Sequence, residues 1–433
     1  MNSWTTVPFG ILGDRGEAGF ALGPFGSKVT TKDYVASGVP FIRGVNLGGG
    51  RFRDEGFVFL DEATAREVES AAVASGDLVF TRKGTIGQVS MIPRASRFPS
   101  YVISSSQMKA RLDENKALPE FYYYWFRSPQ GQHALLANAS QVGVPSIANS
   151  LSTLRRILVP FPSRVEQQAI AEVLGALDDK IAFNERIAST ARELCRAVMQ
   201  ELWIRGGFMS LTREVTTARH NWRRVTLGKL CAAGGGAIQT GPFGSQLHAS
   251  DYVDSGIPSV MPQNIGDNFI SEEGIARITA ADAERLSKYL LAEGDIVYSR
   301  RGDVKRRALV RKYEAGWLCG TGCLRVRVGS AAEPLFISYY LGEPEIQEWI
   351  AQHAVGATMP NLNTAILGGV PVVLPPGEEV RRINERLAGP DAVAAHMQHE
   401  NRTLADLRDT LLPQLLSGQL RVKDAIRTVE EVV

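Results

Sequence analysis

Residues 163–205 read SRVEQQAIAEVLGALDDKIAFNERIASTARELCRAVMQELWIR, and this stretch predicts one long helix in the middle of the chain. Apolar or small residues recur every three or four positions and form one stripe along the helix. These residues are Ile170, Leu174, Leu177, Ile181, Ala188, Ala191, Leu194, Val198 and Leu202. About 40 helical residues would extend roughly 60 Å. Because a helix of that length cannot bury its stripe alone, it requires a partner helix.

A candidate partner helix lies near the C-terminal end, between residues 378 and 418, where apolar residues have the same spacing. They are Ile383, Leu387, Ala394, Met397, Leu404, Leu407, Leu411 and Leu415. A polar residue interrupts each stripe, Asn184 in the first and Asn401 in the second, and such residues often specify register. We therefore expect the two helices to pair as an antiparallel coiled coil, although each stripe packing on its own domain is the alternative. Pro390 predicts a kink or a restart in the second helix.

An internal duplication surrounds these helices. The recurring motifs are Trp-x-x-Val-x-x-Gly-x-Leu at 4 and 222, Gly-Pro-Phe-Gly-Ser at 23 and 241, Asp-Tyr-Val-x-Ser-Gly-x-Pro at 33 and 251, and Gly-Asp-x-Val-x-x-Arg-x-Gly at 76 and 294. Their common offset of 218 falls to 215 for Pro-x-Phe at 119 and 334, and to 213 for Glu-x-x-x-Ile at 166 and 379. A series in this order indicates two related domains, and its period is too long for a solenoid.

Each copy predicts a small mixed domain. Short β-rich runs such as 39–45 and 77–81 are bounded by Gly, Pro and Asn, and an aromatic helix follows at 119–127. We expect its aromatic residues to belong to the core. The predicted fold class is α+β, with two mixed α/β domains in tandem, separated by the two long helices and related by a pseudo-twofold. The expected boundaries are 1–162 for the first domain, 163–205 for the central helix, 206–220 for a linker, 221–376 for the second domain, 377–420 for the C-terminal helix and 421–433 for an unassigned tail.

The composition is that of an ordinary soluble chain. Among 433 residues there are four cysteines, which suits a reduced cytoplasm, and the sequence has no apolar run long enough to cross a membrane. The first ten residues lack the layout of a secretory signal. The net charge is only +2, so bulk charge does not indicate nucleic-acid binding, and any such surface must come from local clusters.

No catalytic, cofactor or metal motif is convincing. The glycines at 23–28 and 84–87 are not followed by the Gly-Lys-Ser/Thr of a phosphate loop. His396 and His399 lack a further ligand pair, and Cys319 and Cys323 lack partners at zinc spacing, so a solvated helix face and a core role are favoured. The sequence therefore predicts a binding protein that holds no cofactor or metal.

Two similar modules suit two separated sites on one linear polymer, such as double-stranded DNA, where half-sites repeat about 34 Å apart. Basic residues gather between 300 and 312, opposed only by Asp303, although a solvated hairpin would look similar. The expected DNA-binding residues are Lys28, Arg43, Asn46, Arg82, Lys83, Thr85 and Gln107 in the first copy, and Gln246, Gln263, Asn264, Arg300, Arg301, Lys305 and Arg306 in the second. Among them the Asn and Gln side chains, with Arg43, are candidates for contacts to base edges. The copies diverge most at 81–89 against 299–307, which predicts different target sequences.

Taken together, these motifs resemble those of the specificity subunit of type I restriction–modification systems. The resemblance covers nearly the whole chain. It rests on Gly-Pro-Phe-Gly-Ser with Asp-Tyr-Val-x-Ser-Gly-x-Pro, on GDLVFTRKGTIG at 76–87, on ILVPFP at 157–162 followed by EQQAI, and on LRDTLLPQLLSG at 407–418.

The resemblance implies two target-recognition domains, at 1–162 and 221–376, held apart by spacer helices that act as a ruler. The subunit would be non-catalytic. It would direct two adenine methyltransferase subunits, which bind S-adenosylmethionine, and ATP-dependent motor nuclease subunits to a bipartite DNA target. Three alternatives stay open: a self-sufficient nuclease or methyltransferase, a scaffold that binds protein or glycan, and a recognition subunit of another modification-based phage-defence system.

Overall fold

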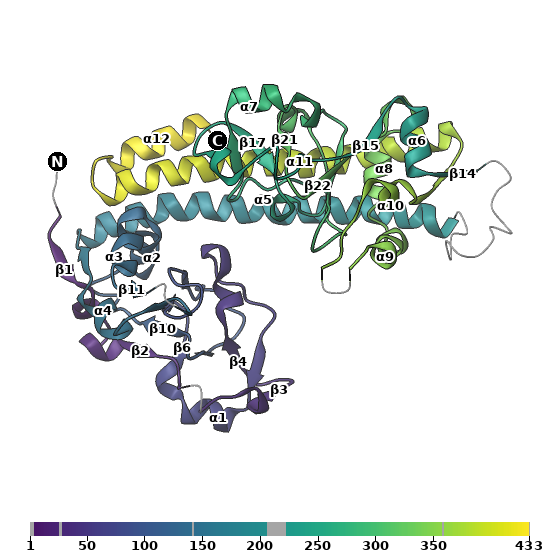
Figure 1. The fold of residues 1–433 in the computed structure, drawn as a ribbon. Coiled ribbons are helices and arrows are strands. Elements are labelled where there is room, and N and C mark those ends of the chain that lie inside the picture. The colour runs from purple at the N-terminus through teal and green to yellow at the C-terminus, as the bar shows by residue number, and fades with distance from the viewer. Residues whose placement is uncertain (1–3, 26–27, 141–142, 206–221, 357–358, 433) are drawn as a thin grey trace. The chain divides into compact units, whose positions relative to one another are not determined.

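A computed structural model describes residues 4–25, 28–140, 143–205, 222–356 and 359–432. The predicted linker at 206–220 lies outside the described residues. The chain divides into two compact units, which are described separately: unit 1 comprises 1–181 with 403–433, and unit 2 comprises 182–402. Each unit holds one domain together with part of each long helix (Figure 1). None of the helices in the described part of the chain is long and apolar enough to cross a membrane.

Unit 1 contains two main sheets. The four-stranded sheet has the order β2 (Phe20–Leu22), β10 (Gln107–Ala110), β7 (Leu78–Thr81) and β8 (Val89–Met91). The five-stranded sheet has the order β3 (Tyr34–Val35), β5 (Val58–Leu60), β4 (Val39–Ile42), β9 (Tyr101–Ile103) and β6 (Ala72–Val73). Two further pairs are β1 (Thr6–Pro8) with β13 (Leu158–Pro160), and β11 (Ala139–Ser140) with β12 (Ser146–Ile147). The helices of this domain are α1 (Glu62–Glu67), α2 (Pro119–Arg127), α3 (Pro129–Leu136) and α4 (Ser150–Arg156).

Unit 2 repeats this architecture. Its first sheet has the order β15 (Ala237–Thr240), β22 (Cys323–Arg327), β19 (Ile296–Ser299) and β20 (Arg307–Leu309), and its second has β16 (Tyr252–Val253), β18 (Ala276–Ile278), β17 (Ile257–Val260) and β21 (Leu318–Cys319). Strand β14 (Arg223–Thr226) pairs with β23 (Pro371–Leu374). The helices are α6 (Leu227–Ala233), α7 (Ala280–Arg285), α8 (Pro334–Tyr340), α9 (Pro344–His353) and α10 (Thr364–Gly368). One pair per second sheet is parallel, β4 with β9 and β17 with β21. The matching strand orders confirm the predicted tandem of two mixed domains.

The Gly-Asp-x-Val motif of the repeat has a structural role in both copies. In unit 1 the carboxylate of Asp77 accepts hydrogen bonds from Nε and Nη2 of Arg111 at 2.8 and 2.6 Å. In unit 2 Asp295 accepts the same pair from Arg327 at 2.7 and 2.6 Å. Both aspartates are buried, so each requires this cation. The repeated aspartate therefore fixes the strand pairing of the first sheet in each domain.

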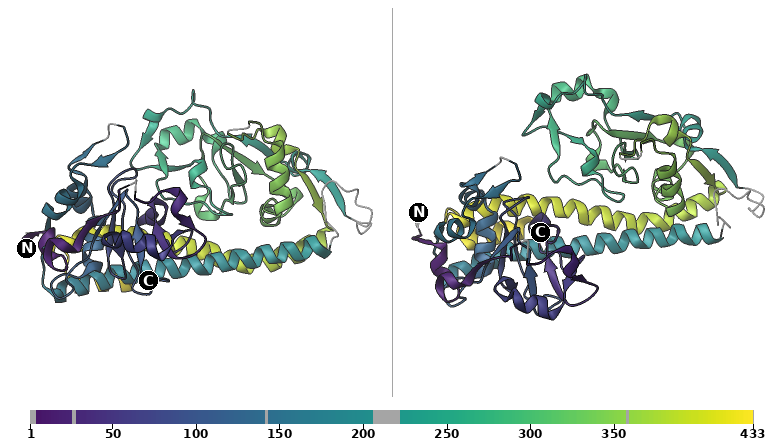
Figure 2. Two further views of the ribbon diagram at one scale, coloured as in Figure 1. Left: turned by 90° about the horizontal axis from the view of Figure 1, so that it is seen from below. Right: turned by 60° about the horizontal axis from the view of Figure 1, so that its bottom comes forward.

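The two long helices are α5 (Arg164–Arg205) and α11 (Gly377–Leu416). Helix α5 begins with a capping box, because Oε2 of Glu166 accepts from both the amide and the hydroxyl of Ser163, at 3.0 and 2.8 Å. In each unit the segments of the two helices lie side by side and run in opposite directions (Figure 2).

Polar contacts between the helices confirm the antiparallel pairing. In unit 1 Asp178 accepts from Nη1 of Arg408 at 2.8 Å. In unit 2 Nδ2 of Asn184 donates to Oε2 of Glu400 at 3.0 Å. As residue numbers rise along α5, those of the partner residues fall along α11. The predicted register residue Asn184 thus pairs with a glutamate and not with Asn401, which is half-buried.

Most of the predicted stripe residues are buried. They are Ile170, Leu174, Leu177, Ile181, Asn184, Ala188, Ala191, Val198, Leu202, Ile383, Leu387, Ala394, Leu404, Leu411 and Leu415. Met397 is half-buried and packs against Ala188, Ala191 and Ala394 from both helices. Elsewhere the stripe residues share hydrophobic clusters with the aromatic helices of their own domains. The stripes therefore pack both on the partner helix and on their own domains. Leu194 is a correction, because its side chain is 53% exposed, in a surface hollow that Pro390 and Val393 of α11 also line.

Two other expectations for the C-terminal region change. Helix α11 runs through Pro390 without a restart, because the buried neighbours Leu387 and Ala394 hold both flanking turns in place. It ends at Leu416, just before Gly418, whose φ of 70° stops the helix. The tail left unassigned by the sequence forms α12 (Val422–Val432), and its Ala425 is fully buried in the core of unit 1.

The aromatic helix α2 spans the predicted residues 119–127, and its six aromatic side chains are buried. They belong to the main core of unit 1, as predicted. The four cysteines are also buried, which agrees with the core role expected for Cys319 and Cys323.

Candidate nucleic-acid interface

In unit 1 three loops meet at one end of the first sheet. We call the described residues of 23–28, 82–88 and 139–147, which leave out 26–27 and 141–142, the first recognition loops. The amide of Gly23 donates to the carbonyl of Gln107 at 3.0 Å, and the amide of Arg82 donates to that of Ser106 at 2.9 Å, so two loops leave the sheet on either side of β10. The third loop joins the second, because Gly84 N donates to the carbonyl of Pro145 at 2.8 Å.

In unit 2 the second recognition loops, which are the described residues of 241–246, 300–306 and 355–361 without 357–358, have the same arrangement. Gly241 donates to Cys323 at 3.0 Å and Arg300 to Gly322 at 2.8 Å, on either side of β22. The amide of Gly302 donates to Pro360 at 3.2 Å, as Gly84 does to Pro145. The two units therefore present equivalent loops.

Glycines are required at two points of this path. A Cβ on Gly23 would lie 1.8 Å from the Ser104 carbonyl, and one on Gly241 would lie 2.1 Å from that of Gly320. Gly84 and Gly302 have φ of 92° and 74°, in the left-handed region. These positions explain why Gly-Pro-Phe-Gly-Ser and Arg-x-Gly recur in both copies.

The charge of the loops is positive. The first recognition loops contain Lys28, Arg82 and Lys83 and no acidic residue. The second contain Arg300, Arg301, Lys305 and Arg306 with one acid, Asp303, which pairs with Arg306 at 3.3 Å. Exposed cations on loops of this kind bind phosphates.

The predicted DNA-binding residues divide by exposure. Seven are exposed: Lys28, Lys83, Thr85, Gln263, Arg301, Lys305 and Arg306. Four are half-buried: Arg43, Arg82, Gln246 and Arg300. Nine of the fourteen lie in the recognition loops, whereas Arg43, Asn46, Gln263 and Asn264 follow strands β4 and β17 of the other sheet, and Gln107 is the first residue of β10.

Three base-edge predictions need correction, because Asn46, Gln107 and Asn264 are buried. Oδ1 of Asn46 accepts from the amide of Arg43 at 2.9 Å, and its Nδ2 donates to the carbonyl of Glu55 at 2.9 Å. Asn264 makes the equivalent bonds to Met261 and Glu273, at 3.1 and 3.2 Å. These side chains hold the chain after β4 and β17, so they do not face a ligand.

Among the half-buried residues, two arginines support the loops. Nε of Arg82 donates to the carbonyl of Ser105 at 3.0 Å, and Nε of Arg300 to that of Leu362 at 3.2 Å. The side-chain oxygen of Gln246 accepts a hydrogen bond from the hydroxyl of Tyr289 at 2.8 Å, so the Gln246 side chain is also bonded within its own domain.

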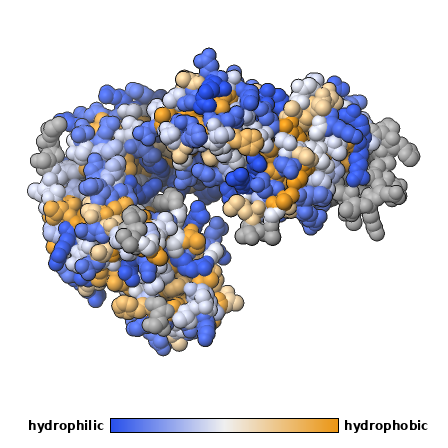
Figure 3. Space-filling model, viewed as in Figure 1, coloured by the Kyte–Doolittle hydropathy of each residue, from blue (hydrophilic) through white to orange (hydrophobic). Residues whose placement is uncertain are grey.

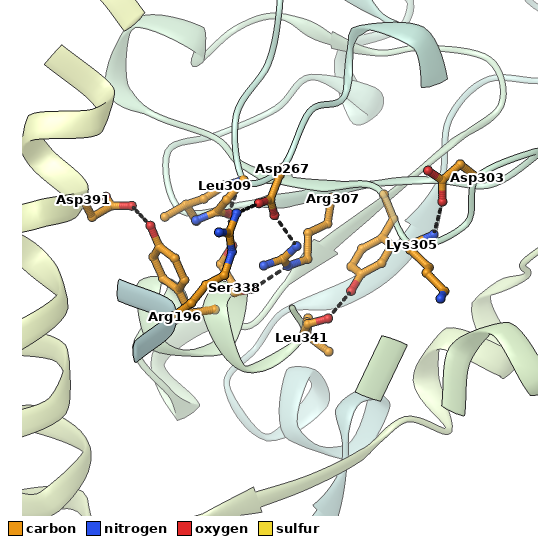
Figure 4. A network of polar contacts seen from close by, with 12 residues as sticks. Arg196, Asp267, Asp303, Lys305, Arg307, Leu309, Ser338, Leu341 and Asp391 are labelled. Atoms are coloured by element: carbon orange, nitrogen blue, oxygen red, sulfur yellow. Dashed lines mark hydrogen bonds and ion pairs between the residues drawn. The ribbon is translucent and has the colours of Figure 1, made fainter. Parts of the chain in front are cut away.

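The basic run at 300–312 is not one surface. Arg307 is buried, donates through Nε to the carbonyl of Ser338 at 2.7 Å, and points toward Asp267, as does Arg196 of α5 (Figure 4). Arg311 donates through Nη2 to Asp391 of α11 at 2.7 Å. Both arginines therefore stabilise unit 2, and the exposed cations of this run are Arg301, Lys305 and Arg306 of the second recognition loops, with Lys312 outside them.

Sequence reasoning missed the third loop of each set. Its signal was present, because Val142-Gly143 with Pro145-Ser146 recurs as Val355-Gly356 with Pro360-Asn361, two residues longer. It also missed the exposure of Phe25 and Phe243 within the recurring Gly-Pro-Phe-Gly-Ser motif. Among the described residues, no three His, Cys, Asp or Glu side chains gather as a metal site.

Similarity to known proteins identifies the family of the chain. The family model of the type I restriction modification DNA specificity domain matches residues 29–191 and again 221–404. The chain belongs to this family. The first matched segment covers the first domain after β2, the second covers the whole second domain, and each extends into the following long helix, so the chain carries two DNA specificity domains.

Relatives of the specificity-domain family agree. The chain is 21% identical over 335 residues to the type I restriction enzyme MjaVIII specificity subunit of Methanocaldococcus jannaschii, covering 75% of each chain. It is 22% identical to the type I restriction enzyme EcoBI specificity subunit of Escherichia coli, covering 72% of this chain and 68% of that one. The S subunit of a type I system from M. genitalium shares the fold, with a TM-score of 0.53, 17% identity and 96% of each chain covered.

Membership of the family establishes DNA recognition of the type I specificity-subunit kind as the role of the two domains.

Proposed function

We propose that the chain is the non-catalytic specificity subunit of a type I restriction–modification complex and reads a bipartite DNA target, one half with each domain. The observation that carries this proposal is the equivalence of the two sets of recognition loops, each anchored beside the central strand of its first sheet. Two readers in one chain require a target with two parts.

The loops differ between the units in the residues they expose. Unit 1 offers Lys83 and Thr85 where unit 2 offers Arg301 and Asp303. Because hydrogen-bonding groups on base edges differ between base pairs, different side chains on the same framework read different sequences. The two halves of the target therefore differ from each other.

The reaction belongs to partner subunits in this proposal. Two adenine methyltransferase subunits supply S-adenosylmethionine, ATP-dependent nuclease subunits join for cleavage, and the chain itself holds no cofactor. The helix pair sets the number of base pairs between the two halves, and the complex acts in the cytoplasm.

Methylome sequencing of the host, with and without this gene, tests the proposal. We expect adenine methylation at a motif of two short parts with a fixed gap, lost when the gene is absent. In a strain carrying Arg301→Ala with Lys305→Ala, methylation of that motif should fall, because two phosphate contacts are removed. The matched control is Lys423→Ala with Arg427→Ala, which removes two exposed cations of α12 outside the loops.

Two results would contradict the proposal. One is methylation or cleavage of DNA by the purified chain alone, which would make it an enzyme. The other is a methylome that does not change on deletion, together with salt-insensitive binding of the pure chain to protein or glycan.

A further inference from the structure

One phenylalanine stands exposed at the same place in both units. Phe25 is 73% exposed and Phe243 is 54% exposed, each at the centre of Gly-Pro-Phe-Gly-Ser. The visible surface of the chain is largely polar, with apolar residues in separate patches (Figure 3). An exposed aromatic ring forgoes the free energy of burial, and two rings do so at equivalent loop positions.

Each ring is carried by a loop whose base is fixed. In unit 2 the amide of Gly241 is bonded to β22, and the hydroxyl of Thr321 donates to the carbonyl of Pro242 at 3.1 Å. On the other side of the ring, Gln246 N donates to the carbonyl of Phe243 at 2.8 Å. In unit 1 the corresponding bond, Lys28 N to the carbonyl of Phe25, is also 2.8 Å. The backbone carbonyl of each phenylalanine is therefore held by a hydrogen bond within its own loop.

The recognition loops combine cations with further exposed apolar side chains. The guanidinium carbon of Arg300 lies 5.8 Å from the centroid of the Phe243 ring. The third loop of unit 2 exposes Val355 and Met359, at 65% and 64%, and that of unit 1 exposes Val144 at 57%. Cations that hold phosphates beside an apolar side chain are the combination found where proteins wedge a side chain into a base step.

We propose that Phe25 and Phe243 are wedges, each of which enters between two neighbouring base pairs in its half of the target and partly unstacks them. The inference rests on the proposed function, because it requires DNA on the recognition loops. Ring burial and the phosphate contacts offset the loss of base stacking. Since pyrimidine–purine steps unstack most readily, each wedge selects a flexible step without a hydrogen bond to a base.

The test uses the full-length chain and a duplex that it selects from a random-sequence library. 2-Aminopurine, whose fluorescence rises when it is unstacked, replaces one base at a time along this duplex. We expect a several-fold rise at one step in each part of the motif. Phe243→Ala should abolish one rise, Phe25→Ala the other, and each should weaken binding by about 10-fold, equivalent to 1.4 kcal/mol. Phe243→Trp should retain the rise, and Ile426→Ala, which removes an exposed side chain of α12, should change nothing.

The possible failures are distinguishable. Two outcomes would overturn the wedge and leave the proposed function standing, provided that the chain selects and binds a duplex. In one, fluorescence rises at no position; in the other, both rises persist in the two alanine variants. If Phe243→Ala leaves binding and fluorescence unchanged but abolishes capture of a modification subunit, the ring is a protein contact and the wedge is overturned. If the chain selects no duplex, both proposals fall.

Discussion

The hydroxyl of Tyr124 donates a hydrogen bond to Oδ2 of Asp178 at 3.1 Å, and Tyr339 makes the equivalent bond to Oδ1 of Asp391 at 3.0 Å. Each bond links the aromatic helix of a domain, α2 or α8, to a long helix, α5 or α11. The two aspartates occupy matching positions of the duplication, offset by 213 residues. The same buried bond thus attaches both domains to the helix pair.

Asp178→Asn should destabilise unit 1 by about 3 kcal/mol, because the substitution leaves the half-buried cation Arg127 without its carboxylate and Arg408 with only the exposed Asp409. Hydrogen exchange of the α2 amides measures this loss locally. Asp179→Asn, at the exposed neighbouring position, is the matched control and should have no effect.

This effect should depend on pH. Burial opposes ionisation of Asp178, but the hydrogen bond from Arg408 and the charges of Arg127 and Arg408 outweigh it and lower its pKa below the usual value. A lowered folded-state pKa gives stability that is present above about pH 4 and is lost as pH falls through the folded pKa. The difference between the wild type and Asp178→Asn should therefore shrink below about pH 4, and a difference that grows there would contradict the assignment.

Glu343→Ser should stabilise unit 2 at pH 8. Glu343 is 3% exposed at the start of α9, and burial, with the charge of Glu345, raises its pKa to about 7. A raised carboxyl pKa means that stability falls as pH rises from the unfolded value of about 4.5 toward 7. Serine occupies the equivalent position 128, where its hydroxyl caps α3. We expect a gain on the order of 2 kcal/mol at pH 8 and a smaller one at pH 5, by denaturant unfolding. Glu348→Ser, at an exposed position of α9, should show no such pH dependence.

Arg301→Ala and Arg300→Ala should separate DNA binding from loop support. Arg301 is exposed, so its loss should reduce the salt slope of DNA binding by about one, without changing the melting temperature. Arg300 donates a hydrogen bond to the carbonyl of Leu362. Its loss should therefore destabilise the loop by about 1 kcal/mol and raise the rate of amide hydrogen exchange at 300–306. Equal melting shifts for the two variants would refute this division.

Pro390→Ala should stabilise unit 2 by about 1–3 kcal/mol, since alanine restores a hydrogen bond to the carbonyl of Arg386 inside the continuous helix α11. Thermal unfolding measures the gain. Pro344→Ala is the control, because Pro344 is the first residue of α9, where proline is favourable and no gain follows. A melting temperature that drops for Pro390→Ala would show that the proline fits its site better than alanine.

Helices and repeats were predictable because their signals are periodic. The spacing of residues such as Leu174 and Leu387 indicates a buried stripe, and capping by Ser163 and Glu166 marks where α5 begins. Leu194 shares the spacing but not the burial, since 3.6-residue periodicity defines a stripe without defining its width. Helix α12 was missed although Val422, Ala425 and Val429 recur at helical spacing and lie in or against the core of unit 1.

Site residues were less predictable, because residue type does not reveal which hydrogen bonds are already made. Asn46 and Asn264 have the chemistry of adenine readers, yet the backbone of their own loops uses both ends of each amide. Arg307 and Arg301 lie in one basic run. Arg307 is the first residue of strand β20 and is buried, whereas Arg301 lies in the preceding loop and is exposed.

The pairing of β1 with β13 places Thr6 opposite Pro160, and β14 with β23 places Arg223 opposite Leu374. The polypeptide therefore enters and leaves each domain through two paired strands, and the second of these strands directly precedes a long helix. Replacing such a domain by a relative requires the short strand pair to match, together with the buried contacts that the domain makes with the long helices. Under the proposed function, recombination that exchanges one domain within the gene would change one half of the DNA target without any change in the partner subunits.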